Sequence, residues 1–279
     1  MRKTSPAFTL IELLIAMAVL ALMLVFLLQI TSQTMQATKR TTQQLNSTQS
    51  ARQCLDALST DIAHAVLMGG ATILTAPGAG GTSPALAFLT CGRGPDSTPS
   101  RFLAVSYKLG NNTLTRSYKA IGWADVPGTY PNLLSAAEEA ATSPVFTSTL
   151  STGILQFSVL AILEDGSRVS LLTPPANAAG AATIDGQSVP SGWTALVPSK
   201  PPLPSPLNSG TARVRGLLVA IASVDEQDFS LLATIPSFSQ AAAATSDPVG
   251  AWETELAIQS LPGPARAAIR FSSKIIPFP

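Results

Sequence analysis

The stretch FTLIELLIAMAVLALMLVFLL (residues 8–28) decides the architecture of this chain. Thr9 and Glu12 are its only polar residues, and every residue from Leu13 to Leu28 is apolar. At about 1.5 Å per residue, a helix of this length is roughly 31 Å long, which matches the hydrocarbon thickness of a bilayer. We therefore expect residues 8–30 to form a membrane-spanning helix.

The helical pattern continues well beyond the apolar stretch. No glycine or proline occurs from Ala7 to Met68, so nothing in these residues predicts a break. Residues 31–50 are nearly all polar, and apolar residues then recur at spacings of three and four. These apolar residues are Leu55, Leu58, Ile62 and Val66. The sequence predicts one continuous helix that ends at Gly69-Gly70, with residues 31–68 as an amphipathic continuation that packs on a globular domain from about residue 50.

Short strand-like segments follow the helix. The strand candidates are residues 86–91, 101–109, 113–121, 153–163, 167–173, 212–224 and 270–279, the last as an edge strand. Gly110-Asn111-Asn112 predicts a tight hairpin turn. Residues 71–85 and the proline-rich residues 174–210 are expected to be irregular loops, and residues 226–268 short helices and loop. We therefore predict an α+β fold, with the long helix packed on a mainly antiparallel sheet in a head of residues 71–279.

Composition excludes several kinds of site. Charged residues are 12% of the chain and the formal net charge is +1, so bulk charge does not attract nucleic acid and no nucleic-acid partner is expected. The chain has one histidine, His64, and two cysteines, which are too few for a His/Cys metal cage. Nucleotide-binding, zinc-protease and nucleophile-elbow motifs are absent from the sequence, so we expect no enzyme, no cofactor and no metal.

Four other features have a structural interpretation that we prefer to a functional one. Asp225, Glu226 and Asp228 supply too few oxygens for a calcium loop and are expected at a solvated strand end. His64 is expected on the helix surface or in packing. The tryptophans are expected to anchor core or loops. They are Trp123, Trp193 and Trp252.

Cys54 lies on the predicted helix and Cys91 at the end of the first predicted strand. Outside the cytoplasm they could form a disulfide that closes 36 intervening residues and stabilises the fold by about 2–4 kcal/mol. The alternative is two independent thiols, and the sequence leaves both open.

The chain begins with MRKTSPA, a short basic segment that ends in a small residue, followed by FTLIE and an unbroken apolar helix. This N-terminus resembles that of type IV prepilins and type II secretion pseudopilins, which have such a leader and an acid at the position of Glu12. The resemblance implies a leader of residues 1–7, cleavage between Ala7 and Phe8 by a prepilin peptidase, and N-methylation of Phe8. Ala7 departs from the usual glycine, which puts efficient cleavage in question. A secretory signal peptide is disfavoured by the length of the apolar run, whereas a plain signal anchor remains an alternative.

Glu12 is costly in hydrocarbon, because insertion scales give about 2.5–3.5 kcal/mol for a comparable acid at a helix centre. It lies one helical turn after Phe8, so in a bundle of staggered helices it can meet the new amino group of a neighbouring subunit. Such a pair would neutralise both charges and fix the stagger. We therefore expect Glu12 to set the register of assembly.

Weaker similarities extend along the chain. Arg52, Leu58 and Asp61-Ile62, together with RFLAVSYKLGNNTLTRSY and RVRGLLVAI, resemble the J-type minor pseudopilins of the filament tip. VAIASVDEQDFSLL and RFSSKIIPFP are similar to pilin-like proteins of the Verru_Chthon cassette. Glu12 argues against a K-type tip subunit, which typically lacks this acid.

These resemblances imply an inner-membrane, single-pass protein with a periplasmic or extracytoplasmic head, which assembles into a filament. The implied partners are the prepilin peptidase, other pilins or pseudopilins, the inner-membrane assembly platform and membrane lipid. Two alternatives remain open at this point. One is a minor pilin for DNA uptake or adhesion, and the other is a binding or enzymatic domain held by a signal anchor.

Overall fold

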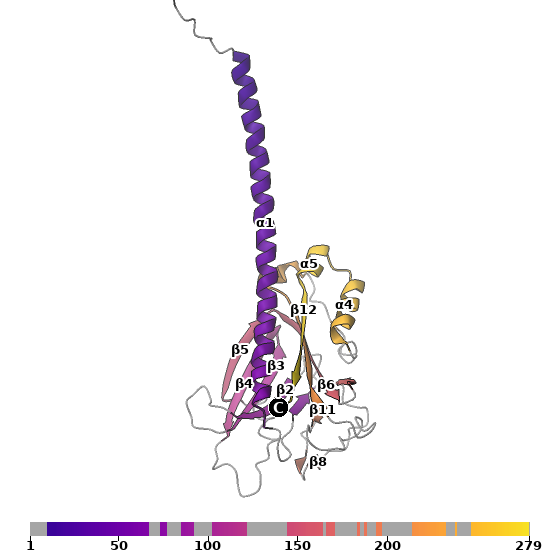
Figure 1. Cartoon of the computed structure of the whole chain (residues 1–279). Helices are drawn as coiled ribbons and strands as arrows, with labels where there is room; N and C mark the ends of the chain where they lie inside the picture. Colours follow the sequence, from indigo (N-terminus) through magenta and orange to yellow (C-terminus); the bar gives the residue numbers. More distant parts are fainter. Residues whose placement is uncertain are drawn as a thin grey trace, which may run out of the picture. The chain divides into compact units, whose positions relative to one another are not determined.

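The structure is a computed structural model that describes residues 10–66, 73–76, 85–91, 102–121, 144–163, 166–170, 183–184, 187–188, 194–196, 214–232, 238 and 247–278. The chain divides into two compact units, residues 1–45 and residues 46–279. Figure 1 shows the elements coloured along the sequence, with the long helix α1 in indigo and the C-terminal elements in yellow. The second unit is called the head below.

Helix α1 runs without interruption from Leu10 to Ala63, as predicted. Every residue from 10 to 42 is exposed. In the head, α1 presents one apolar face, and its buried residues follow the predicted spacing. They are Ala51, Cys54, Leu55, Leu58 and Ile62. The head therefore contains the last turns of α1 and begins at Asn46, slightly before the predicted residue 50.

The prediction that α1 ends at Gly69-Gly70 is wrong. The helix ends at Ala63 because the next residues pair with a strand. Ala65 forms an isolated antiparallel bridge with Thr90. The amide of Val66 donates to the Leu89 carbonyl at 2.9 Å, and the His64 carbonyl accepts from the amide of Cys91 at 2.9 Å. Strand pairing thus stops the helix before any glycine does.

The larger sheet of the head, called the large sheet, is antiparallel in order β10-β1-β2-β3-β4-β5. Its strands are β1 (Ile73–Ala76), β2 (Ala85–Cys91), β3 (Phe102–Gly110), β4 (Thr113–Ile121), β5 (Phe146–Thr152) and β10 (Thr194–Leu196). Strands β2, β3 and β4 confirm the predictions. The β3–β4 turn does too, since Asn111 and Asn112 adopt φ of 49° and 57° there.

The other main sheet, called the small sheet, is antiparallel in order β12-β11-β6-β7. Its strands are β6 (Ile154–Leu163), β7 (Arg168–Ser170), β11 (Val214–Ser223) and β12 (Arg270–Pro277). All four were predicted, and β12 is an edge strand as expected. Gly153 links β5 of the large sheet to β6 of the small sheet with φ of 81°.

The loop predictions are wrong in part. Residues 71–85 contain β1, which pairs with β2 and β10. Residues 174–210 contain β10 and a short ribbon of β8 (Thr183–Ile184) and β9 (Gln187–Ser188). Strand β5 was not predicted, because FTSTLST has few large apolar residues. This segment can be recognised as a strand only from its pairing with β4.

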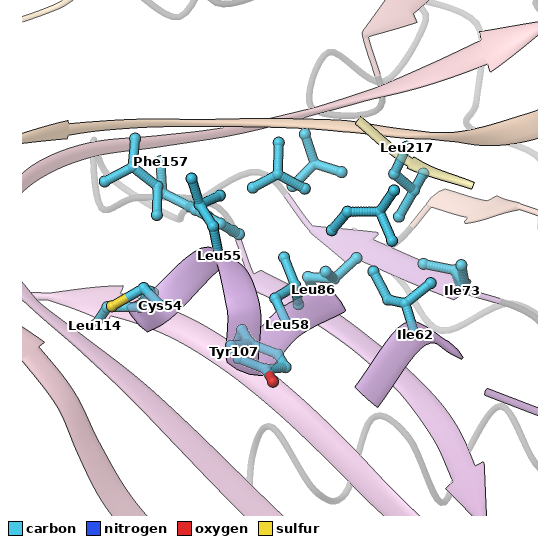
Figure 2. Packing of buried hydrophobic residues seen from close by; sticks show 14 of the residues in the cluster. Cys54, Leu55, Leu58, Ile62, Ile73, Leu86, Tyr107, Leu114, Phe157 and Leu217 are labelled. Atoms are coloured by element: carbon cyan, nitrogen blue, oxygen red, sulfur yellow. The ribbon is translucent and has the colours of Figure 1, made fainter. Parts of the chain in front are cut away.

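The main core is formed by α1 and both sheets together. Figure 2 shows side chains of all three parts in one cluster. The helix contributes Leu55 and Leu58, the large sheet Leu86 and Tyr107, and the small sheet Phe157. The fold class is therefore α+β, with the long helix packed on antiparallel sheets, as the sequence predicted.

A second buried cluster covers the other face of the small sheet, where Ala220 and Ala222 of β11 contact short helices. These helices are η3 (Glu226–Leu231), α4 (Pro248–Ile258) and α5 (Gly263–Ala268). Trp252 of α4 is fully buried there beside Phe238 and Phe271, which confirms its role as a core residue. Trp123 and Trp193 lie outside the described residues.

Candidate functional site

The first 33 residues of α1 that the structure describes, Leu10–Thr42, present side chains on all sides of an exposed helix. An 18-residue window within α1 has a mean hydropathy of 2.9, and α1 is long and apolar enough to cross a membrane. Large apolar side chains such as Leu14, Leu20 and Phe26 are each more than half exposed. A surface this apolar must be buried against something outside the chain, such as lipid or other helices.

Glu12 lies in the first turn of this helix as described, and its residue is exposed. A carboxylate in a first turn interacts favourably with the helix dipole, whose positive end lies at the N-terminus. The predicted cleavage and methylation residues, Ala7 and Phe8, lie outside the described residues. The structure therefore places Glu12 in the first described turn of α1, and its role in register remains a prediction.

Threonines dominate the polar part of α1 that precedes the head. Their hydroxyls donate to the carbonyl four residues earlier at 2.8–3.0 Å, so each is satisfied within the helix. They are Thr31, Thr34, Thr38, Thr41 and Thr42. This arrangement lets the helix pass from an apolar to an aqueous environment without an unpaired hydroxyl.

Within the head, the last turn of α1 is joined to the large sheet by a buried polar network. Arg116 of β4 donates to Asp61 of α1 through Nε at 2.7 Å to Oδ2 and through a second nitrogen to Oδ1. The Tyr107 hydroxyl of β3 donates to Oδ2 of Asp61 at 2.5 Å. Tyr107 and Arg116 are directly opposite each other in the β3–β4 ladder, so their side chains share the face that meets α1.

The side chains of this network are largely shielded from water. The Asp61 side chain is 9% exposed and that of Arg116 is 23% exposed. Burial, and then the negative charge of Asp61, raise the pKa of Tyr107 far above its usual value, so its hydroxyl remains a donor throughout the ordinary pH range. Arg116 also stacks over the ring of Tyr118, 4.3 Å from its centroid. From the sequence, Asp61 was noted only in the resemblance to J-type subunits, and Tyr107 and Arg116 were not singled out within the stretch RFLAVSYKLGNNTLTRSY.

One signal could have revealed the network. Asp61 is an acid inside the apolar periodicity, three residues after Leu58 and beside Ile62. A buried acid requires a cation or several donors. Arg116 is a basic residue in a predicted strand, opposite a tyrosine across a predicted hairpin, and is therefore the natural candidate.

The helix also contacts the small sheet through an exposed ion pair. Lys274 of β12 lies 2.7 Å from Asp56, whose side chain is 71% exposed. Such a pair contributes little to stability because water screens it. It serves as a natural comparison for the buried pair five residues later on the same helix.

Of the two arrangements that the sequence left open for Cys54 and Cys91, the structure has the independent thiols, since both residues are free. Cys91 lies beside His64, whose carbonyl accepts from its amide. Cys54 is ten residues before His64, about 15 Å along the helix, whereas bridged Cα atoms lie less than about 7 Å apart. Burial raises the pKa of Cys54 to about 11, opposed by a hydrogen bond with the Ser151 side chain. Cys91 is exposed.

The remaining candidate residues have structural roles. The His64 ring is exposed, with Nδ1 2.7 Å from the Thr60 carbonyl oxygen, as expected for a helix-surface residue. Asp225 caps η3 by accepting from the amide of Gln227, and Glu226 accepts from the Thr152 hydroxyl at 3.3 Å. In the part of the chain that the structure describes, no group of three His, Cys, Asp or Glu residues could hold a metal ion.

Comparison with known proteins identifies the N-terminal segment. Residues 2–28 match the prokaryotic N-terminal methylation motif. The chain carries a prepilin-type N-terminus. A solved type IV-like pilin from Thermus thermophilus is similar at 11% identity and a TM-score of 0.40, over 83% of this chain and 96% of that chain. No curated protein matches the chain.

The prepilin-type N-terminus ends at residue 28, where the apolar run ends, and includes Glu12. Its described residues all belong to the exposed part of α1. The motif therefore coincides with the exposed apolar part of α1. The network of Asp61, Arg116 and Tyr107 lies outside the motif, in the folded head.

Proposed function

We propose that the chain is a minor pilin or pseudopilin, a structural subunit that assembles through its N-terminal helix into a type IV pilus-like or type II secretion filament. The observation that supports this best is the methylation motif on an apolar helix whose side chains are exposed all round. A helix of this kind can span a bilayer before assembly and pack against equivalent helices of other subunits in a filament. The folded α+β head then remains outside the membrane.

In this proposal, a prepilin peptidase cleaves between Ala7 and Phe8, and the new amino group of Phe8 is methylated. Glu12 of one subunit pairs with the amino group of a neighbour. The pair neutralises two charges that would each be costly in an apolar bundle. A subunit in the filament is thereby favoured over a subunit alone in the bilayer.

The proposal also includes location and partners. The protein is held in the inner membrane by one span, with the head on the extracytoplasmic side, until an assembly platform and other pilins draw it into the filament. The similarities to J-type subunits support a position at or near the tip. Membrane lipid covers the apolar part of α1 before assembly.

Processing of the N-terminus is the decisive test. The full chain would be co-expressed with a prepilin peptidase and its methyltransferase activity, and the N-terminus measured by intact-mass spectrometry. We expect loss of residues 1–7 and addition of one methyl group to Phe8. Retention of Met1 in the presence of active peptidase would leave the chain as a protein with a plain signal anchor.

Two variants make this test quantitative. Ala7→Gly restores the residue that prepilins usually have before the cut, and we expect it to raise the cleaved fraction. Ala7→Glu places a bulky charge at the same position and should abolish cleavage while leaving the apolar helix unchanged. A processed Ala7→Glu variant would mean that another protease cuts the chain.

A further inference from the structure

We propose that the buried network of Asp61, Arg116 and Tyr107 is a register lock, which fixes the axial position of α1 between the two sheets of the head. The remaining contacts of this part of α1 with the core are mostly apolar. The lock is the buried contact in the described head in which a charged group of the helix meets a charged group of a sheet.

The apolar face of α1 does not define one position by itself. Its buried apolar residues recur mainly at spacings of three and four, and they are Ala51, Cys54, Leu55, Leu58 and Ile62. A shift of the helix by four residues would place Ala51 where Leu55 lies and Leu58 where Ile62 lies. Leucine in the place of Ile62 nearly conserves volume, which cores tolerate well, whereas alanine in the place of Leu55 leaves a cavity, so apolar packing gives only part of the preference for the native position.

The polar network distinguishes these positions. After the same shift, Ala57 would stand where Asp61 lies, and Arg116 and Tyr107 would lose their common acceptor. A partly buried guanidinium and a fully buried hydroxyl without a partner are penalised. Selection of one register among several is the best attested role of single buried polar groups in helical packing.

The lock has a consequence for assembly that rests on the proposed function. The register decides how many helix residues separate Glu12 from the sheets of the head. A slip of one turn would change that number by three or four. If the helices of a filament all pack with the same stagger, subunits with different helix registers could not place their heads in equivalent positions.

The register can be read by a cross-link within the head. The Ser151 side chain of β5 is hydrogen bonded to Cys54 of α1, so a Ser151→Cys substitution places a second thiol beside Cys54 in the native register. Cys91→Ser removes the other native thiol. The full chain in detergent micelles would be oxidised, and the fraction with the internal bond measured by mass spectrometry after digestion.

In this background we expect the bond to form in most molecules. Replacing the whole network with apolar residues, as Asp61→Leu, Arg116→Leu and Tyr107→Phe together, should keep the protein folded but reduce the cross-linked fraction at least threefold. Asp56→Leu removes the exposed acid on the same helix and should leave the fraction unchanged. An unchanged fraction in the folded triple variant would overturn the proposal.

Asp61→Asn provides a second measurement that does not depend on the triple variant folding. It retains the volume of the side chain and one acceptor oxygen, but removes the charge. We expect a cross-linked fraction between those of the parent and the triple variant. A fraction equal to that of the parent would overturn the proposal. Because the readout is within the head, it is independent of whether the N-terminus is cleaved or the chain assembles.

Discussion

Arg116 and Asp61 are 55 residues apart in the sequence, and two nitrogens of the Arg116 guanidinium donate to the two oxygens of the Asp61 carboxylate. This two-point contact joins β4 to the last turn of α1. Since both side chains are largely buried, removal of one leaves the other charged in a poorly hydrated place. The pair therefore matters most when it is broken on one side only.

Removal of Arg116 alone should be costly. We expect Arg116→Leu to reduce the free energy of unfolding by about 3–5 kcal/mol, because the Asp61 carboxylate loses its cation. Chemical denaturation of the full chain in micelles, followed by the signal of the head, measures this. Asp61→Leu in the same chain should recover a large part of the loss. A double variant that is less stable than either single variant would contradict this explanation.

The exposed pair gives the matched control. Lys274→Leu removes the cation that contacts Asp56, which is well exposed. We expect a change within about 1 kcal/mol, because exposed ion pairs contribute little. A loss as large as that of Arg116→Leu would mean that burial is not what distinguishes the two pairs.

Gly153 marks the passage of the chain from the large sheet to the small sheet. Its φ is 81°, and an added Cβ would lie 2.1 Å from the Val224 carbonyl oxygen, so the backbone would have to move. Gly166 has the same φ with no atom within 4 Å of such a Cβ. We expect Gly166→Ala to cost about 1–2 kcal/mol from backbone conformation alone. Gly153→Ala should cost clearly more, and equal losses in thermal denaturation would show that the close approach is unimportant.

Stability should fall at alkaline pH. The pKa of Cys54 is raised from 9.0 to about 11, so the folded state holds this proton more tightly than the unfolded state. Its contribution is present in full below pH 9 and is lost between pH 9 and 11, at about 1.4 kcal/mol per pH unit. Tyr107 acts in the same direction, because its pKa is also raised. Denaturation at pH 8, 9 and 10 measures the slope, which Cys54→Ala should reduce.

The two thiols should differ sharply in reactivity. Cys91 is exposed and Cys54 is buried with a raised pKa, and only thiolates react with alkylating agents. At pH 8 we expect iodoacetamide to modify one thiol per chain, at Cys91, and a second only after denaturation. Peptide mapping identifies the site. Rapid modification of Cys54 in the native protein would mean that the end of α1 separates readily from β5.

The sequence predicted the elements that have a strong local pattern. Sixteen apolar residues from Leu13 to Leu28 and the spacing of Leu55, Leu58 and Ile62 defined α1, and Gly110-Asn111-Asn112 defined the β3–β4 turn. What it missed depends on partners distant in the chain. β1 is a strand because it pairs with β2 and β10, and β10 is one because it pairs with β1. The end of α1 is fixed by Thr90 and Cys91, more than 20 residues later, and the same pairing keeps Cys91 away from Cys54.

Glu12 provides the sharpest test of the assembly mechanism. Glu12→Leu removes an acid from an apolar helix, so insertion into the membrane should be unchanged or improved. Glu12→Gln keeps the shape and removes only the charge. If Glu12 pairs with the amino group of a neighbouring subunit, both variants should enter filaments about tenfold less than the parent or worse, since each loses more than about 1.4 kcal/mol of pairing. Membrane fractionation and the amount of protein in sheared filaments measure the two properties separately. Normal incorporation of Glu12→Gln would show that shape at this position, and not charge, is what assembly requires.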